Sequence, residues 1–333
     1  MRFPLQFTVA QYRHRRNMIR KGHRRFPTVL MLEPLYTCNL SCLGCAAERH
    51  TGKLQDRLSV AECLAASDAC GAPIVNICGG EPTLYPELPD LVSRLIERGR
   101  HVLCCTNALR LKDRILNVIP PHPQFQIVVH LDGMRETHDR VAQRPGVFDT
   151  VVDAIRSAKQ ARYIVMINTT VYTDTSVEEV EELFRLSHEL RTDGVLVSPG
   201  YEYATAQQDL FLRGDAISEK FRRIRAIARD YKVNVTPVFL DFAAGDLDLP
   251  CAPWSTVNYG PGGWRSPCYL IGERSHFDWE TFWRETNWEY WERRTDPRCR
   301  NCRMHSGFEH SAVEHAMRTF GGKLKLFWWT VSK

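Results

Sequence analysis

Three cysteines within eight residues constrain this chain more than any other feature. Cys38, Cys42 and Cys45 have the spacing C-x3-C-x2-C and follow an apolar run at residues 29–32. Three thiolates on one short loop can ligate three irons of a [4Fe–4S] cube, which leaves the fourth iron open to a small molecule. A structural zinc site needs four ligands and usually takes them from two separated pairs. The loop therefore predicts a cluster with one open iron, against the alternative of a chance grouping of small buried cysteines.

Composition places the chain among soluble globular proteins. Of its 333 residues, 44% are hydrophobic and 25% charged, which predicts one large domain or two modest ones. We expect no membrane span, because no run of about 18 apolar residues occurs, and no secretion signal. Twelve cysteines without an export signal favour a reducing cytoplasm and metal ligation over disulfides. A net charge of +5 does not by itself imply nucleic acid, which we do not expect as a partner.

The first 27 residues form a basic segment. Residues 12–25 read YRHRRNMIRKGHRR and contain seven Lys or Arg. Three interpretations compete: a solvated helix, a nucleic-acid arm, or a surface that rests on anionic lipid. Aromatic and cationic residues together favour the membrane–water interface, and residues 323–329 read KLKLFWW. Peripheral contact with the inner membrane surface by a cytoplasmic protein is therefore one expectation.

Short apolar runs then alternate with amphipathic helical patterns. The pattern predicts strands at residues 29–32, 74–77, 101–105, 125–131, 163–171 and 194–197, and helices at residues 59–70, 86–98, 147–160, 177–189 and 217–231. Strict alternation of this kind implies a parallel sheet, and parallel strands linked through helices curl into a full or partial barrel. The predicted fold class is α/β, with a partial (β/α)6 TIM-like barrel over residues 28–235.

Polar residues follow five consecutive predicted strands. The second strand ends in a Gly-Gly-Glu-Pro turn, in which two glycines allow close backbone approach and a carboxylate with exposed carbonyls can accept bonds from an ammonium. Any one of these residues alone reads as a cap or turn, but together they favour a polar ligand such as ribose. The candidate cofactor-binding residues are Gly79, Gly80, Glu81, Pro82, Asn107, Asp132, Asn168 and Ser198.

Four more cysteines lie in a Pro- and Gly-rich region beyond residue 236. Cys251, Cys268, Cys299 and Cys302 could close a second [4Fe–4S] cluster, with structural zinc as the rival interpretation. We prefer iron–sulfur, because the first site already commits the chain to cluster assembly. Residues 236–333 are accordingly predicted to form a smaller Cys-rich C-terminal domain. Three remaining cysteines, Cys63, Cys70 and Cys104, read as small buried hydrophobes, and we assign no metal to His305, His310 or His315.

The three-cysteine loop after an N-terminal strand, followed by the Gly-Gly-Glu-Pro turn, resembles the radical S-adenosylmethionine (radical SAM) superfamily. That resemblance implies a six-stranded partial barrel and an open iron that chelates S-adenosylmethionine, whose methionyl amine meets residues 79–82. An electron from the cluster then generates a 5′-deoxyadenosyl radical, and the electron donor is of the flavodoxin or ferredoxin type. The four later cysteines are similar to the twitch-type auxiliary-cluster domain. Gly44 departs from the superfamily, which commonly has an aromatic residue there.

Longer segments resemble the adenosylhopene synthase family over nearly the whole chain. They lie at residues 25–35, 131–140, 146–149, 197–203, 239–242 and 267–270. The resemblance implies that the adenosyl radical adds to the terminal alkene of the isoprenoid diploptene and forms a carbon–carbon bond. The product radical then needs a hydrogen atom, for which Cys105 is the expected donor, while Cys104 should point to the opposite side of the strand. Cys105 may instead be read as a simple buried strand residue.

The chain departs from that family at three places. It has Ala46-Ala47 where the family has Gly-Lys, Ser306 where the family often has a cysteine, and Cys78 where it has a small residue or proline. Two other functions therefore remain open. One is a radical SAM enzyme that abstracts hydrogen from a sugar, alcohol or peptide, and the other is a non-enzymatic zinc or iron–sulfur module.

Overall fold

Six strands rich in aliphatic residues form the parallel part of one sheet. The computed structural model describes residues 5–203 and 210–332. Residues 1–4 and 333, at the ends of the predicted N-terminal segment and C-terminal domain, lie outside that description. The strands are β1 (Val29–Leu32), β2 (Ile74–Ile77), β3 (His101–Thr106), β4 (Phe125–His130), β5 (Ile164–Val171) and β6 (Gly194–Pro199). Each pairs in parallel with the next, so the predicted mixed α/β fold with a parallel sheet is confirmed.

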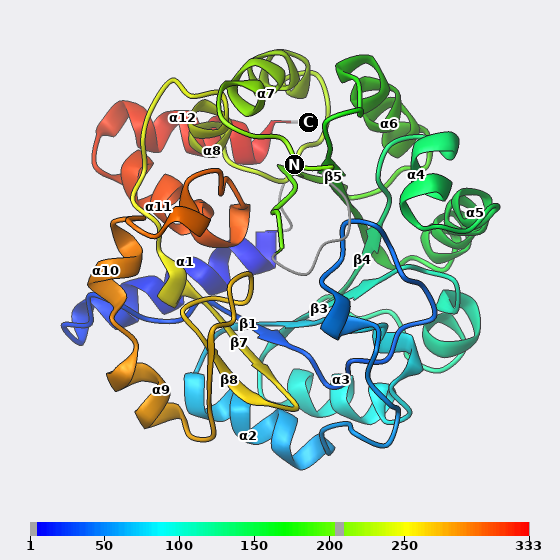
Figure 1. Cartoon of the computed structure of the whole chain (residues 1–333), viewed down its shortest axis with the longest axis horizontal. Helices are drawn as coiled ribbons and strands as arrows, with labels where there is room; N and C mark the ends of the chain where they lie inside the picture. The colour runs from blue at the N-terminus through cyan, green and yellow to red at the C-terminus, as the bar shows by residue number, and fades with distance from the viewer. Residues whose placement is uncertain (1–4, 204–209, 333) are drawn as a thin grey trace.

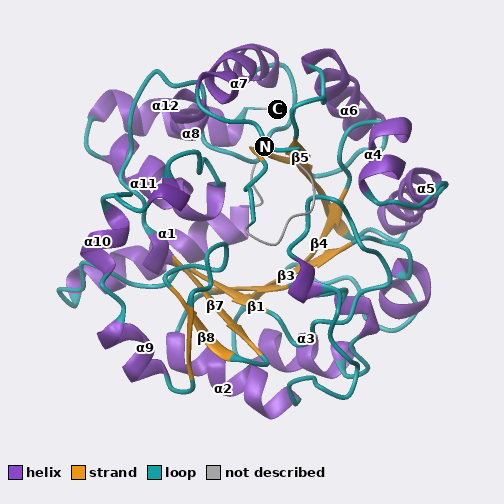
Figure 2. Ribbon diagram, in the orientation of Figure 1, coloured by secondary structure: helices purple, strands orange, loops and turns teal. Residues whose placement is uncertain are grey.

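The C-terminal region adds three strands to the same sheet. β7 (Thr256–Gly260) pairs in parallel with β1, and β8 (Gly263–Ser266) and β9 (Arg274–His276) follow as antiparallel strands. The strand order is β6-β5-β4-β3-β2-β1-β7-β8-β9, so β6 and β9 are the two ends of the sheet. The separate domain predicted from residue 236 stays a prediction, as does the barrel, although Figure 2 shows the strands curving around a central region.

Helices cover the outer face of the curved sheet, as Figure 1 shows. They begin where the sequence supplies caps: Ser59 and Glu62 form a capping box at one helix, and Ser176 caps another. Leucines and valines three and four residues apart face the strands and form one continuous core. These helices are α2 (Val60–Cys70), α3 (Leu88–Glu97), α4 (Arg135–Val141), α5 (Val147–Gln160), α6 (Val177–Glu189) and α7 (Asp215–Ala228).

The two ends of the chain meet on one side of the molecule. α1 (Leu5–Arg20) lies against α11 (His305–Met317), where Arg15 binds Glu314 through two hydrogen bonds. α12 (Phe320–Val331) follows α11 and packs on α8 (Pro237–Ala243). The remaining short helices are α9 (Trp279–Glu285) and α10 (Trp288–Glu292), with 3-10 turns at Ala47–Arg49, Pro82–Leu84, Pro253–Ser255 and Pro297–Cys299 and a π turn at Lys112–Leu116.

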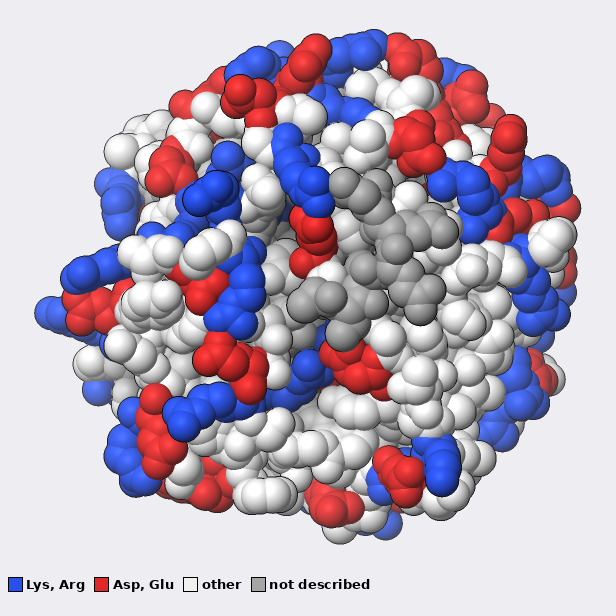
Figure 3. All heavy atoms as spheres, viewed as in Figure 1, with Lys and Arg blue, Asp and Glu red and all other residues white. Residues whose placement is uncertain are grey.

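The charge pattern and hydropathy of the structure bear on its surroundings. Across the described ranges, no helix combines the length and apolar character that crossing a membrane requires. On the face in Figure 3, acidic and basic side chains are interspersed around the periphery, and a broad uncharged area lies beside the central region.

Candidate active site

The three clustered cysteines lie on the loop that leaves the carboxyl end of β1. Cys38, Cys42 and Cys45 are each partly exposed. The loop is fixed by its backbone: the Leu40 N–H donates to Cys38 Sγ at 3.4 Å, and the Leu43 N–H donates to the Val141 carbonyl at 2.9 Å. An N–H directed at a sulfur stabilises the thiolate that a metal requires.

The electrostatics of this loop fit a cationic cluster. Burial, with smaller contributions from neighbouring charges, raises the pKa of Cys38 to about 12 and raises the pKa values of Cys42 and Cys45. Without a cation these thiols stay protonated, because three adjacent thiolates repel one another. Within residues 5–203 and 210–332, no three His, Cys, Asp or Glu converge on a single ion. Each thiolate of a four-iron cluster binds a different iron, so the loop suits a cluster better than one metal ion.

The two glycines after β2 allow close approach of the chain that leads into Cys38. A Cβ on Gly79 would lie 2.6 Å from the Leu35 carbonyl oxygen, and one on Gly80 would lie 2.1 Å from the Thr37 carbonyl oxygen. Gly79 also has a φ of +106°. The sequence analysis ascribed the glycines to ligand approach, whereas here they bring the end of β2 against the cluster loop.

The Glu81 carboxylate joins the ends of β2 and β3. It is 2% exposed and accepts hydrogen bonds from Thr83 Oγ1 at 2.6 Å, Thr106 Oγ1 at 2.7 Å and the Asn107 N–H at 2.9 Å. Asn107 Nδ2 in turn donates to Asn39 Oδ1 at 2.8 Å in the cluster loop. Both predicted cofactor residues are therefore brought to the cluster loop. The carboxylate of Glu81 positions backbone, which leaves carbonyls of the Gly-Gly-Glu-Pro turn as the groups for an ammonium.

Asp132 is fully buried at the end of β4 and binds its neighbours on both sides. Its Oδ2 lies 2.5 Å from His130 Nε2, and its Oδ1 accepts from the Thr170 N–H at 2.6 Å. Burial alone would raise the pKa of Asp132, but the charge of the His130 ring outweighs it, and the pKa is lowered. Asn168 pairs with His130 in the β4–β5 register and is partly exposed.

Ser198, the last predicted cofactor residue, is directed elsewhere. It is 3% exposed at the end of β6, and its Oγ donates to Met304 Sδ at 3.8 Å. Met304 follows the last cysteine pair, so this contact joins the strand to the C-terminal cysteine region.

Cys105 lies on the inner side of β3 and Cys104 on the outer side. Cys105 is partly exposed and its Sγ donates to Asn76 Oδ1 at 3.2 Å, whereas Cys104 is fully buried in the core. Burial raises the pKa of Cys105 to about 11, although the bond to Asn76 works against the shift. The thiol therefore keeps its hydrogen at neutral pH.

Tyr172, just after β5, explains the unusual Gly44. An ideal Cβ on Gly44 would lie 2.1 Å from Tyr172 Oη, so no side chain fits there. Tyr172 is 2% exposed and packs with Phe211, Val141, Leu210 and Leu43 in a second apolar cluster beside the loop. An aromatic ring thus reaches this place from a distant strand. Sequence reasoning missed Tyr172, and the only signal was the glycine itself.

A buried ion pair that the sequence did not reveal lies behind the cluster loop. Arg49 Nε donates to Glu33 Oε1 at 2.7 Å, and the two side chains are 8% and 1% exposed. The Arg49 guanidinium also donates to the Tyr269 carbonyl at 2.8 Å and lies 5.4 Å and 5.3 Å from the ring centroids of Tyr203 and Tyr269. Because Tyr269 follows Cys268, Arg49 links the two cysteine regions.

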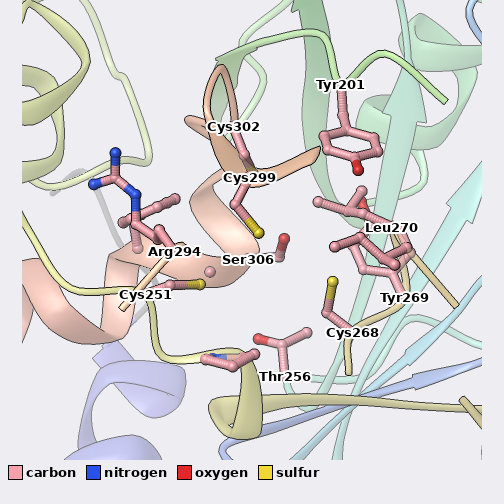
Figure 4. A pocket seen from close by; sticks show the side chains of 14 residues that line it. Tyr201, Cys251, Thr256, Cys268, Tyr269, Leu270, Arg294, Cys299, Cys302 and Ser306 are labelled. Atoms are coloured by element: carbon pink, nitrogen blue, oxygen red, sulfur yellow. The ribbon is translucent and has the colours of Figure 1, made fainter. Parts of the chain in front are cut away.

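The four C-terminal cysteines line one cavity, which Figure 4 shows from close by. Cys251, Cys268, Cys299 and Cys302 surround it together with Ser306, the position where the resembling family often has a cysteine. Burial is the largest cause that raises the pKa of every one of these thiols, to about 11 for Cys299 and about 12 for Cys302. Four sulfurs around one space suit a cluster without an open iron.

Comparisons with known proteins agree with this geometry. Residues 32–187 match the model of the Radical SAM superfamily, and residues 195–326 match a domain of unknown function, DUF3463. The Fe-coproporphyrin III synthase of Methanosarcina barkeri is 26% identical over 199 residues, which is 56% of this chain and 50% of that protein. GTP 3′,8-cyclase 1 of Mycobacterium tuberculosis is 29% identical over 182 residues, 51% of this chain and 50% of that protein. The chain spans about half the length of these relatives.

Solved structures give the same fold at low identity. Streptococcus suis SuiB bound to S-adenosylmethionine superposes with a TM-score of 0.65 at 16% identity, over 94% of this chain and 79% of that one. SuiB bound to its precursor peptide SuiA gives 0.62 at 17% identity, over 93% and 77%. These likenesses concern the fold.

Proposed function

We propose that this chain, a member of the radical SAM superfamily, cleaves S-adenosylmethionine reductively and adds the 5′-deoxyadenosyl radical to an isoprenoid alkene. The superfamily uses a [4Fe–4S] cluster and S-adenosylmethionine. Cys38, Cys42 and Cys45 would hold that cluster, which when bound supplies the electron that breaks the sulfonium bond. The carbonyls of residues 79–82 would orient the methionyl amine. Asn107, Asp132 and Asn168, at the edge of the partial barrel, would bind the nucleoside.

The Cys105 thiol is the observation that carries the addition reaction. Addition of a carbon radical to an alkene leaves a second carbon radical, which must take a hydrogen atom. Cys105 presents an S–H bond on the inner side of β3 beside Asn76, and its raised pKa keeps it protonated. The hydrogen atom moves from Cys105 Sγ to carbon, and one electron with one proton restores the thiol. Overall, each turnover consumes two electrons and one proton.

The apolar cluster beside the loop supports an apolar substrate. Leu43, Val141, Tyr172 and Phe211 bring hydrocarbon surface to the carboxyl edge of the strands. Gly200 makes room for it, because a Cβ there would lie 2.7 Å from the Phe211 ring. Such a wall excludes water from a reactive radical and favours an isoprenoid over a charged substrate.

The product mass tests this function. The protein, prepared without oxygen and given S-adenosylmethionine, a strong reductant and diploptene, should yield the alkene enlarged by an adenosyl group and one hydrogen. Boiled protein and an incubation without alkene are the controls. Release of free 5′-deoxyadenosine in step with turnover, without an adduct, would refute the addition chemistry.

The four-cysteine cavity favours one alternative function. A metal cluster there could take an electron from a substrate radical, which would make hydrogen abstraction from a sugar, alcohol or peptide an oxidation. The same mass measurement decides, because a dehydrogenated product is two mass units lighter than its substrate and contains no adenosyl group.

Contact with a lipid surface completes the proposal. Five large apolar side chains on one face of α12 are exposed, namely Phe320, Leu324, Phe327, Trp328 and Val331. The opposite face is tied down, since Trp329 Nε1 donates to the Val235 carbonyl at 2.9 Å and Lys325 binds Asp241. Aromatic residues flanked by lysines are typical of the membrane–water interface, where an isoprenoid substrate resides.

A further inference from the structure

A cleft of about 530 Å³ separates α1 from α11, away from the β-strand edge that carries the candidate active site. Its walls come from the end of α1 and the turn after it, from residues 248–252, and from α11. Cys251 lines this cleft and also lines the four-cysteine cavity. A molecule seated in the cleft would therefore be separated from the four thiols by a single residue.

The acidic residues in the cleft walls are already neutralised. Each is bound by an arginine, in the pairs Glu314–Arg15, Glu292–Arg25 and Asp248–Arg294. Two further cations in the walls, Arg24 and Arg318, are exposed. Neither has an ion pair within the part of the chain that the structure describes. The net charge that the walls present to solvent is therefore positive.

The adjoining face of α1 extends this positive charge. Arg16 and Arg20 are exposed and lie within one helical turn of Ile19 and His23, which line the cleft. No Asp or Glu occurs in the sequence before Glu33, so nothing on the helix itself offsets them. A cleft with charge of one sign at its rim concentrates partners of the opposite sign and accelerates their association.

We propose that this cleft docks a small acidic protein that donates single electrons to the metal group held by the four C-terminal cysteines. The proposal rests on the proposed function, which requires two electrons per turnover. One electron leaves the reduced donor in each encounter and reduces the metal group beside Cys251, and no atom is transferred. Positive charge around the cleft selects the acidic donor, and Cys251 supplies the short path between donor and acceptor.

The test uses charge reversal around the cleft. The variant R16E/R20E/R24E/R318E is compared with R156E/R185E, whose arginines are exposed on α5 and α6 on the other side of the molecule (Figure 1). The probe is a reduced acidic flavodoxin. Its affinity is measured by titration at low ionic strength, and its oxidation on mixing is followed by stopped flow. Sodium dithionite replaces it in a parallel series.

We expect the cleft variant to bind flavodoxin at least about tenfold more weakly and to oxidise it correspondingly more slowly at low salt. The difference should vanish near 1 M salt, where the Debye length falls to about 3 Å. The control variant should match wild type, and all three proteins should react equally with dithionite. Equal flavodoxin affinity of the cleft variant and wild type would overturn the docking proposal. Binding of wild type, but not of the cleft variant, to anionic vesicles with no binding of flavodoxin would also overturn it. Failure of wild type to cleave S-adenosylmethionine with dithionite would instead refute the proposed function.

Discussion

At the residue scale, the sharpest test concerns the hydrogen donor. Cys105→Ala should leave cleavage of S-adenosylmethionine intact, because Cys105 has no contact with the cluster loop among the hydrogen bonds described for it. Formation of the reduced adduct should fall by more than about tenfold, since the loss of 1.4 kcal/mol of transition-state stabilisation suffices. Product mass and yield are measured together with 5′-deoxyadenosyl products.

Cys104→Ala serves as the matched control for the donor. Cys104 lies on the same strand but faces the core, so its replacement should lower stability slightly and leave the product unchanged. A Cys105→Ala variant that forms the same adduct at the wild-type rate would exclude the donor role.

Gly44 offers a second test at single-residue resolution. Gly44→Ala would place a methyl group 2.1 Å from Tyr172 Oη, so the cluster loop must move. We expect less iron and sulfide per chain after anaerobic reconstitution, and partial recovery in Gly44→Ala/Tyr172→Phe, which lacks the clashing oxygen. Gly321→Ala is the control, because a Cβ there has open space. Full iron content in Gly44→Ala alone would contradict the steric account.

At the scale of elements, a buried carboxyl couples the C-terminal helices to pH. Glu309 on α11 accepts hydrogen bonds from the Thr236 N–H at 2.6 Å and from Thr236 Oγ1 at 2.7 Å, at the start of α8. Burial raises the pKa of Glu309 from 4.5 to about 7, although both bonds to Thr236 oppose the shift. The folded chain therefore holds a proton between about pH 4.5 and pH 7 that the unfolded chain has lost. This contribution to stability declines as pH rises through that window, by at most about 3 kcal/mol.

Glu309→Gln should remove this dependence, because the amide keeps an acceptor oxygen and does not titrate. Urea unfolding midpoints at pH 5 and pH 8 measure the change. Glu182→Gln, at an exposed position on α6, is the control and should follow wild type. If Glu309→Gln and wild type lose stability equally between the two pH values, the carboxyl is not the cause.

The strands and helices that sequence reasoning found and missed differ in a physical way. β1, β2, α5 and α6 coincide with the predicted ranges, because each is a long periodic or β-branched run between clear turn residues. β7 escaped prediction, since its Thr256–Gly260 sequence is polar and its partner β1 is more than two hundred residues away. Pairing over such a distance leaves no periodic signal in the sequence.

The same distinction holds for the candidate site. Cys38, Cys42, Cys45 and the Gly-Gly-Glu-Pro turn declare themselves by spacing, because their chemistry requires neighbours in sequence. Tyr172 and Arg49 do not, since their roles depend on Gly44 and Glu33 meeting them through the fold. The four C-terminal cysteines lie between these cases: the sequence predicted them as one set, and the structure places them around one cavity.

At the scale of the whole molecule, the exposed face of α12 should set the affinity for lipid. Phe327 and Trp328 are 57% and 65% exposed, and transfer of one such side chain from water contributes on the order of 1.5–3 kcal/mol. Phe327→Ser/Trp328→Ser should therefore weaken binding to vesicles of mixed neutral and anionic lipid by at least about tenfold, as measured by cosedimentation. Phe277→Ser is the matched control, because Phe277 is 92% exposed on the loop after β9, far along the chain from α12. If both variants sediment with vesicles as wild type does, α12 is not the lipid-binding element. If only the α12 variant is released while its cleavage of S-adenosylmethionine persists, the membrane contact serves access to the substrate and has no part in forming the radical.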